Sequence, residues 1–205
     1  MTATAIGSYA TTAALKSLIG TTDSNDDTLI GLICDRVNSY IEDVTGRVMA
    51  PIASAIYLLD GDGTDRLYFP RGIRAISLLE IADYTGDSYT TETATNYLIR
   101  PPAHERLNGW PATWLHLSDR STQHKVFPVG YDTARMTATT GFAAIPDDIT
   151  NLALIVAQRA WNGRQSGYQN IEGTDEQGRP LIARFFQLPD YQTLLRYKLR
   201  DFRHV

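Results

Sequence analysis

Hydrophobic residues recur at helical spacing in two stretches near the start of the chain. The first, residues 11–19, is followed by Gly20, a residue that commonly ends helices because it adopts left-handed backbone angles. The second begins at Ser24 and Asp27, which have the spacing of a capping box, and ends at Thr45. Its apolar residues lie three or four positions apart, which predicts one buried stripe. That stripe consists of Ile30, Ile33, Val37, Ile41 and Val44.

After Pro51 the helical spacing gives way to short apolar runs of strand length. The runs cover residues 56–59, 66–69, 76–82, 97–99, 114–117 and 135–140. Gly61 and Gly63 separate the first two runs, and two glycines so close together predict a tight hairpin turn. This part of the chain is therefore predicted to be β-rich, with about five to seven short strands.

Helical spacing returns at Pro146, where Asp147 and Asp148 complement the positive end of a helix dipole. The predicted apolar side of this third helix is Ile149, Leu152, Ala153, Val156 and Ala160. Residues 163–180 are rich in glycine and predict a loop or arm. A final helix is predicted from Pro189 onward. Its predicted apolar side is Tyr191, Leu194, Leu195, Leu199 and Phe202.

These elements predict an α+β chain in which a β-rich unit interrupts a helical core. We expect a small bundle of about four helices, a sandwich- or barrel-like β insertion and an extended C-terminal arm. The predicted parts are N-terminal core helices in 1–50, the β insertion in 51–141, the third core helix in 142–163, and a flexible arm with a basic docking helix in 164–205.

Composition narrows the function classes only slightly. The 205 residues are 43% hydrophobic and 20% charged, with a net charge of −4, which argues against a generally cationic nucleic-acid coat. The N-terminus lacks the basic and apolar regions of a signal peptide, and no apolar stretch is long enough to span a bilayer, so a cytosolic protein is expected. The single Cys34 excludes an intrachain disulfide and a multi-cysteine zinc site.

The sequence offers little catalytic chemistry. None of the four histidines has metal-ligand spacing, and neither a nucleophile elbow nor a phosphate-binding glycine loop is present. Asp60 and Asp62 alternate with glycines as calcium ligands can, but the segment lacks the closing glutamate of a calcium loop, and a turn is the simpler interpretation. We therefore expect no enzyme, no catalytic residue, no metal and no cofactor.

One alternative function rests on aromatic residues. Trp110, Trp114 and Tyr131 would form a sugar-binding platform if the fold brought them together. The chain would then be a carbohydrate- or ligand-binding β domain on a helical stalk. Packing of these residues in the core and loops is the competing interpretation.

The charges are divided unevenly along the chain. Residues 179–205 hold six basic and two acidic residues, a balance of +4, so the total of −4 leaves −8 for residues 1–178. On the last predicted helix, Arg196, Arg200 and Arg203 have helical spacing. They form either a solvated helix face or a docking element for an acidic partner or a phosphate backbone.

The order of four motifs resembles the head–tail connector (adaptor) proteins of tailed bacteriophages and gene transfer agents. The motifs are the short opening helix in 9–19, the Ile-Glu-Asp-Val-Thr-Gly-Arg helix ending at 41–47, the Gly-x-Gly segment and following strand in 60–76, and the glycine–aromatic and Pro-Asp helix entry in 139–149. The resemblance runs almost end to end, although compact members of the family lack the long β insertion.

The resemblance implies a structural virion protein that is located in the neck and assembled in the host cytoplasm. Such adaptors form a ring of about twelve subunits beneath the portal, extend the DNA channel and join head to tail. The implied partners are the portal protein, a downstream neck or tail protein, further copies of the chain and, non-specifically, DNA in the channel; no membrane is involved, and the isolated chain can be a monomer. The C-terminal segment commonly docks on the portal, which assigns docking roles to Arg179, Arg184, Phe185, Phe186, Arg196, Lys198, Arg200 and Arg203.

Overall fold

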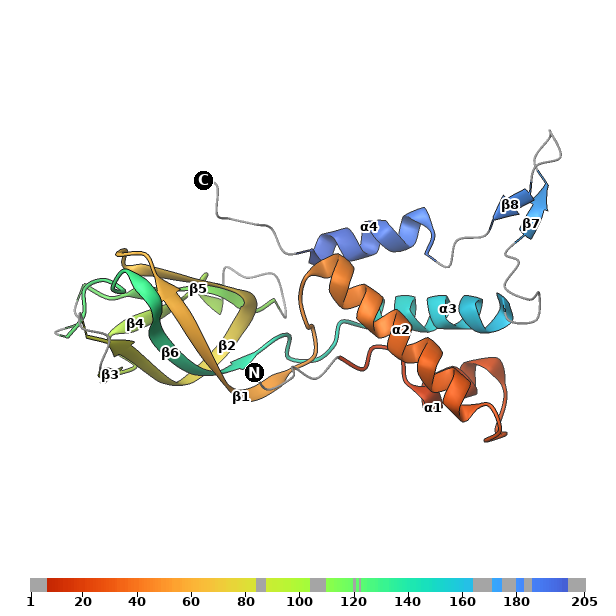
Figure 1. Cartoon of the computed structure of the whole chain (residues 1–205), viewed down its shortest axis with the longest axis horizontal. Helices are drawn as coiled ribbons and strands as arrows, with labels where there is room; N and C mark the ends of the chain where they lie inside the picture. The colour runs from red at the N-terminus through yellow and green to blue at the C-terminus, as the bar shows by residue number, and fades with distance from the viewer. Residues whose placement is uncertain are drawn as a thin grey trace. The chain divides into compact units, whose positions relative to one another are not determined.

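A computed structural model of the chain describes residues 7–83, 88–103, 110–119, 121, 123–163, 171–174, 180–182 and 186–198. The chain divides into a helical unit, Met1–Val48 with Ile145–Val205, and a sheet unit, Met49–Ala144. Figure 1 shows the helices and strands in these units. The predicted α+β class is confirmed by four helices and a large antiparallel sheet among the described residues.

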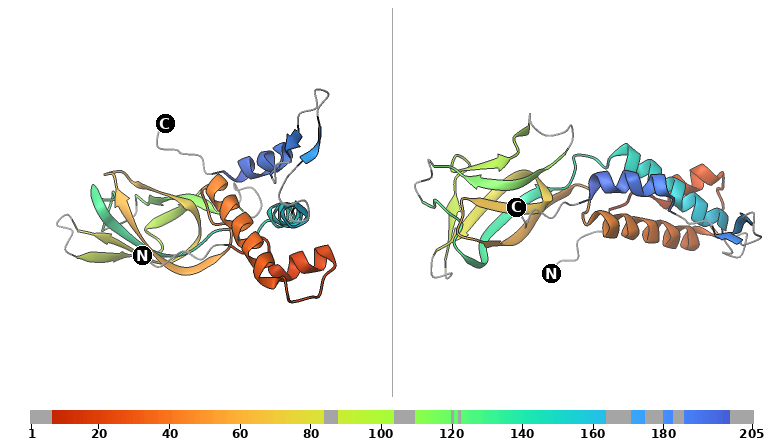
Figure 2. Two further views of the ribbon diagram at one scale, coloured as in Figure 1. Left: turned by 45° about the vertical axis from the view of Figure 1, so that its right-hand side comes forward. Right: turned by 90° about the horizontal axis from the view of Figure 1, so that it is seen from above.

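The helical unit contains α1 (Thr12–Ile19), α2 (Asp27–Thr45), α3 (Asp147–Gly163) and α4 (Leu188–Tyr197). Helix α2 lies against the other three helices, and α3 also contacts α1 and α4. Figure 2 shows α3 nearly end-on, with the other helices of the unit around it. The four helices lie where the apolar periodicity predicts them.

Local signals account for both ends of α1 and for the C-terminal end of α2. The Thr11 hydroxyl caps the start of α1, and Gly20 and Gly46 end α1 and α2 with φ of 71° and 70°. The expected capping box at the start of α2 is wrong. Ser24 accepts a bond from the amide of Asp27 through its backbone carbonyl, at 3.1 Å, and no side chain caps this end of the helix.

The predicted apolar stripes form the core of the helical unit. Four of the five predicted positions of α2 are buried, and Val44 is half-buried. On α3 the predicted Ala160 is half-buried, whereas Ala157 and Trp161 are buried instead. The buried residues of α3 are Ile149, Leu152, Ala153, Val156, Ala157 and Trp161.

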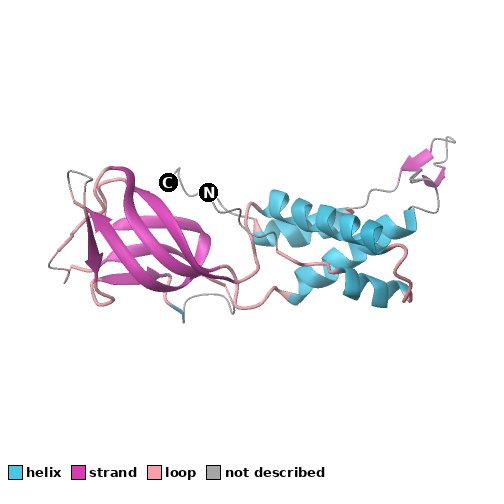
Figure 3. Cartoon of the chain, turned by 60° about the horizontal axis from the view of Figure 1, so that its bottom comes forward, coloured by secondary structure: helices cyan, strands magenta, loops and turns pink. Residues whose placement is uncertain are grey.

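The sheet unit is built on six antiparallel strands. They are β1 (Ile52–Gly61), β2 (Arg66–Ala82), β3 (Tyr89–Glu92), β4 (Tyr97–Arg100), β5 (Ala112–Leu117) and β6 (Gly130–Thr140). The strand order is β1-β6-β2-β5-β4, and β3 pairs with β2. The order ends at β1 and β4, so the sheet is open rather than a closed barrel (Figure 3). Its core lies inside the curve of the sheet. The largest fully buried members are Phe127, Ile73, Leu79, Ile81, Leu115, Leu117 and Met136.

The predicted hairpin between β1 and β2 is wrong. Ile56 on β1 and Leu78 on β2 both pair with Thr137, because β6 lies between the two strands. The glycine segment is therefore a connection between strands that are not neighbours. Asp62 organises this connection by accepting bonds from the amide and the hydroxyl of Thr64, at 2.9 and 2.6 Å.

Two predicted strands form the single strand β2, which changes partner along its length. Its first part pairs with β5 and its second part with β6; Ile73 pairs with Ala112 on one side and Thr140 on the other. Gly72, with φ of 90°, immediately precedes the change, and a Cβ there would collide with the ring of Pro111. Glycine is needed at this corner for both reasons.

The segment expected to be a loop between α3 and α4 contains two short strands. They are β7 (Ile171–Thr174) and β8 (Pro180–Ile182), which pair as a separate two-stranded sheet. Strand β3 is a third strand that the apolar runs did not predict, because its sequence, Tyr-Thr-Thr-Glu, has no aliphatic residue.

Candidate docking surface

The inner side of α4 packs on its own helical unit. Leu194 and Tyr197 are buried. Phe186, just before the helix, stacks on Tyr40 of α2 with ring centroids 4.2 Å apart, and Tyr191 packs against both rings. The hydroxyls of Tyr40 and Tyr191 lie 2.6 Å apart, within hydrogen-bonding distance. The start of α4 is therefore anchored by an aromatic cluster.

Three polar contacts tie α4 to α3. Asp190 accepts bonds from the Gln187 amide at 2.7 Å and from the Arg159 guanidinium at 2.5 Å, so one carboxylate both caps α4 and pairs with α3. At the other end, Tyr197 donates to Asp148, and Arg196 pairs with the same carboxylate at 3.2 Å. These contacts hold both ends of a helix of only ten residues.

Two tyrosines of this region have a raised pKa. Burial, followed by the hydrogen bond to Asp148, raises the pKa of Tyr197 to about 12. Burial and the Tyr191 hydroxyl raise the pKa of Tyr40 to about 12 as well. Both hydroxyls therefore stay protonated at neutral pH and act as hydrogen-bonding groups rather than charges.

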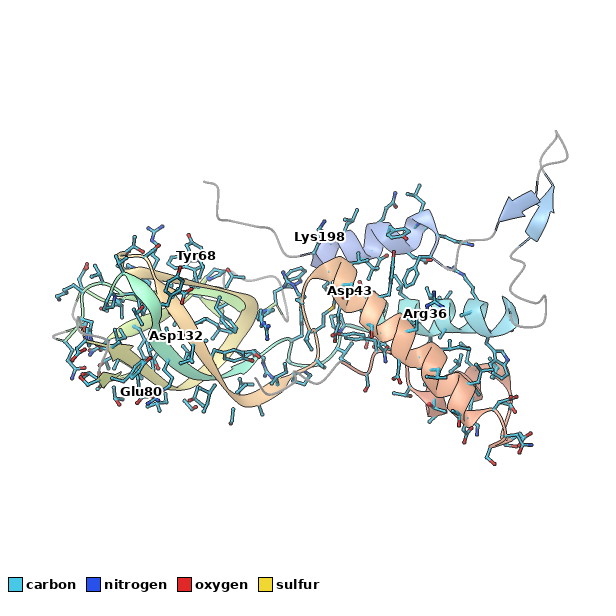
Figure 4. All side chains as sticks on the ribbon, in the orientation of Figure 1. Arg36, Asp43, Tyr68, Glu80, Asp132 and Lys198 are labelled. Atoms are coloured by element: carbon cyan, nitrogen blue, oxygen red, sulfur yellow. The ribbon has the colours of Figure 1, made fainter. Side chains whose placement is uncertain are left out.

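The outer side of α4 carries leucines and cations. Leu188 is 73% exposed and Leu195 is 57% exposed, and they lie seven positions apart on one side of the helix. Arg196 and Lys198 are also exposed. We define these four residues as the docking surface, and Figure 4 labels Lys198 at its C-terminal end.

The position of Leu195 corrects the sequence prediction. It was expected on the buried side with Tyr191 and Leu194, yet it points away from the core. Leu199 and Phe202, the rest of the predicted stripe, lie outside the described residues.

The predicted docking residues divide into three groups. Arg196 and Lys198 are exposed, although Arg196 also pairs with Asp148. Phe186 is only 9% exposed, so the structure gives it an internal packing role. Arg179, Arg184, Phe185, Arg200 and Arg203 lie outside the described residues. Sequence reasoning missed Leu188 and placed Leu195 on the buried side of the helix. The sequence did contain a signal for both, because residues seven positions apart lie on the same side of a helix, away from the side that carries Leu194 and Tyr197.

The structure gives the aromatic residues of the alternative function different neighbours. Trp110 packs edge-on against Phe142, with centroids 5.5 Å apart, whereas Trp114 lies beside Tyr68 on the sheet. Tyr131, 90% exposed, is the second residue of β6. The described contacts therefore do not assemble a platform from these three side chains.

Within the described residues, no group of three or more His, Cys, Asp or Glu side chains is arranged to hold a metal ion. Among the same residues, no helix has the length and apolar character needed to cross a membrane.

Comparison with known proteins gives matches in structure only. No family model and no curated protein sequence matches the chain. A chain from the neck of an empty gene transfer agent particle, determined with C6 symmetry, superposes with a TM-score of 0.56 at 15% identity; the match covers 97% of this chain and 94% of that one. The chain has the fold of a gene transfer agent neck protein. A chain from the virion of a native gene transfer agent particle matches with a TM-score of 0.50 at 14% identity, over 97% and 94% of the two chains.

These matches confirm the resemblance inferred from motif order. Because identity is about 15%, what the two chains share is the fold. The match extends over nearly the full length of both chains, so the neck chain has a counterpart of the β insertion that compact adaptors lack.

Proposed function

We propose that this chain is a structural virion protein of the neck. In this proposal it is an adaptor that forms a ring beneath the portal, extends the DNA channel and joins the head to the tail. The observation that carries the proposal is a likeness to a neck chain that extends over 97% of the present chain. Function in this class comes from surfaces rather than from a catalytic site.

The docking surface supports a role in attachment to the portal. Leu188 and Leu195 offer apolar area on an anchored helix, and Arg196 and Lys198 add positive charge beside it. Such a helix side fits an apolar groove rimmed by carboxylates. The basic residues that follow in the sequence, Arg200 and Arg203, extend the same charge.

The experiment is a binding assay between the full chain and its portal. Deleting α4 would be a poor test, because deletion also removes the buried Leu194 and Tyr197 and uncovers the core of α2 and α3. The better variant is Leu188→Asp with Leu195→Asp, since both side chains are exposed. Leu32→Asp is the matched control, because Leu32 is a 62% exposed leucine on α2.

We expect the wild-type chain and the Leu32→Asp variant to assemble on the portal, as seen by electron microscopy and co-sedimentation, and the double variant to lose binding. Binding of the double variant at wild-type strength would remove α4 from the proposal. Failure of the wild-type chain to associate with portal or neck assemblies would overturn the proposed function itself.

A further inference from the structure

One end of the sheet unit combines carboxylates with exposed apolar side chains. Asp60 is the last of the alternating exposed residues along β1, and Asp132 lies near the start of β6. The Asp132 amide donates to the Asp60 carboxylate at 2.9 Å, which joins the two strands. Asp62 follows in the connecting loop. Val129 lies beside this loop, since a Cβ added to Gly63 would come within 2.9 Å of its side chain. We call this the acidic end: Leu58, Asp60, Asp62, Val129, Tyr131 and Asp132.

The apolar members of the acidic end are unusually accessible. Tyr131 is 90% exposed, Val129 78% and Leu58 52%. Within the described part of the chain, none of the three carboxylates has an ion-pair partner. The acidic end therefore keeps both its apolar area and its negative charge available to another molecule.

A second surface of the same unit has the opposite charge. On β2, β5 and β4, directly paired residues share one side of the sheet: Tyr68 pairs with Trp114, and Trp114 pairs with Arg100. Arg66 lies over the Trp114 ring, 5.3 Å from its centroid. Leu98, 43% exposed, is two positions from Arg100 on β4. We call Arg66, Tyr68, Leu98, Arg100 and Trp114 the basic face.

The two cations of this face differ in their ion pairing. Arg66 has Asp65 at 3.8 Å, which partly offsets its charge. Arg100 has no ion pair within the residues that the structure describes. Tyr68 is 50% exposed beside it and supplies aromatic area. Figure 4 labels Tyr68, which belongs to the basic face, and Asp132, which belongs to the acidic end.

We propose that the acidic end of one copy docks on the basic face of the next copy. The partner is a second copy of this chain, because one chain carries two different surfaces that match in charge and in apolar character. Two such surfaces on one chain make a heterologous contact, the kind that generates rings. The inference rests on the proposed ring and names the residues that would close it.

A second copy fits these surfaces better than a nucleic acid or a sugar does. Arg66 already covers the Trp114 ring, which reduces its use for stacking on a base or a sugar. The acidic end would repel a phosphate backbone. A protein interface instead uses the exposed Leu58, Val129 and Tyr131 as its apolar centre, with charges at the rim.

Charge reversal tests the pairing in the full chain. Asp132→Lys reduces the negative charge of the acidic end from −3 to −1, and Arg100→Asp reduces the positive charge of the basic face from +2 to 0. Each variant alone should therefore self-associate about tenfold more weakly. An equimolar mixture should recover association, because the reversed end of one variant matches the reversed face of the other. The double variant in one chain should recover it as well. Asp132→Asn is the fold control, since asparagine tolerates the φ of 53° at this position and still removes the charge.

Chemical cross-linking provides the readout for a weak contact. Tyr131→Cys and Leu98→Cys in one chain place a thiol on each surface, while the native Cys34 is buried and 3% exposed. A bismaleimide should then produce a ladder of trimers and larger species. A chain with only one of the two thiols can form no product larger than a dimer, and Leu32→Cys with Ile155→Cys gives the level of random collision.

The ladder should disappear when Arg100→Asp is added and return when Asp132→Lys joins it. A ladder no stronger than that of the Leu32/Ile155 control, or one that charge reversal leaves unchanged, would overturn the inference. The result is separable from the proposed function: a chain that binds the portal but fails this test keeps its neck role and loses this contact. A chain that passes but never associates with portal or neck keeps the contact and loses the role.

Discussion

Tyr197 of α4 donates a hydrogen bond to the carboxylate of Asp148 at the start of α3, with its hydroxyl 2.8 and 3.0 Å from the two oxygens. The contact joins residues 49 positions apart, and the tyrosine ring is buried. Tyr197→Phe keeps the ring and removes the bond. We expect a loss of about 1.5 kcal/mol in the free energy of unfolding, the low end of the usual range for a bond to a charged group, because Asp148 is 37% exposed. Urea denaturation measures it; Tyr131→Phe, on a 90% exposed ring, is the control and should leave stability unchanged.

The same contact predicts how stability depends on alkaline pH. Burial and Asp148 raise the pKa of Tyr197 from 10.0 to about 12 in the folded chain. A raised pKa stabilises the folded state below pH 10, and that contribution is lost as the pH rises from 10 through 12. We expect the urea midpoint to fall over this range, and to fall less in Tyr197→Phe. Equal slopes for the two proteins would contradict the assignment. Tyr40, whose pKa is also about 12, explains any fall that remains.

The helices were predictable because their signals are local. Gly20 and Gly46 mark helix ends through backbone angles that depend on the glycine itself. The stripe on α2 follows from spacing within one segment. The strand pairing was not predictable in this way. Gly63, with φ of 84°, lies in the connection after β1, but no local feature reveals that β6, about 70 positions later, lies between β1 and β2.

The docking surface was predicted only in part, for a related reason. Helical spacing places Leu194 and Leu195 on adjacent sides of α4, and which side is buried depends on α2 and α3. Phe186 was assigned to a partner because it lies in a basic segment; its burial depends on Tyr40, 146 positions earlier. Charge asymmetry, by contrast, needs only the sequence, and it directed attention to α4, whose docking role stays a prediction.

The corner of β2 gives a prediction about Gly72. Gly72→Ala places a methyl group against Pro111 at a φ of 90°, so we expect a loss of about 2 to 4 kcal/mol from overpacking and backbone strain. Gly20→Ala is the matched control: its φ is 71°, but nothing lies within 4 Å of the added atom, and a loss of about 1 kcal/mol is expected. Hydrogen exchange of the sheet unit and the helical unit measures each effect. Equal losses would show that the contact with Pro111 adds nothing.

The two paired glutamates of the sheet unit should differ in their contribution to stability. Glu92 is buried, and its carboxylate bonds with Asn96 at 2.7 Å and His124 at 2.6 Å. Glu80 instead pairs with Arg135, which is 42% exposed. We expect Glu92→Ala to cost about 1 to 3 kcal/mol, because it leaves buried polar groups without their acceptor. Glu80→Ala should cost less than about 1 kcal/mol, since solvent screens the pair. Thermal unfolding of both variants measures the difference, and a larger loss for Glu80→Ala would contradict this assignment.

Adjacent leucines on α4 separate folding from docking. Leu194 is fully buried, so Leu194→Ala should cost about 2 to 4 kcal/mol, which thermal or urea unfolding detects. Leu195 is 57% exposed, so Leu195→Ala should change stability by less than about 0.5 kcal/mol. Portal binding should show the reverse order at a temperature where both variants are folded: Leu195→Ala weakens it, and Leu194→Ala leaves it close to wild type. If both variants lose binding in proportion to their loss of stability, α4 acts only by holding the helical unit together, and the partner contacts another surface.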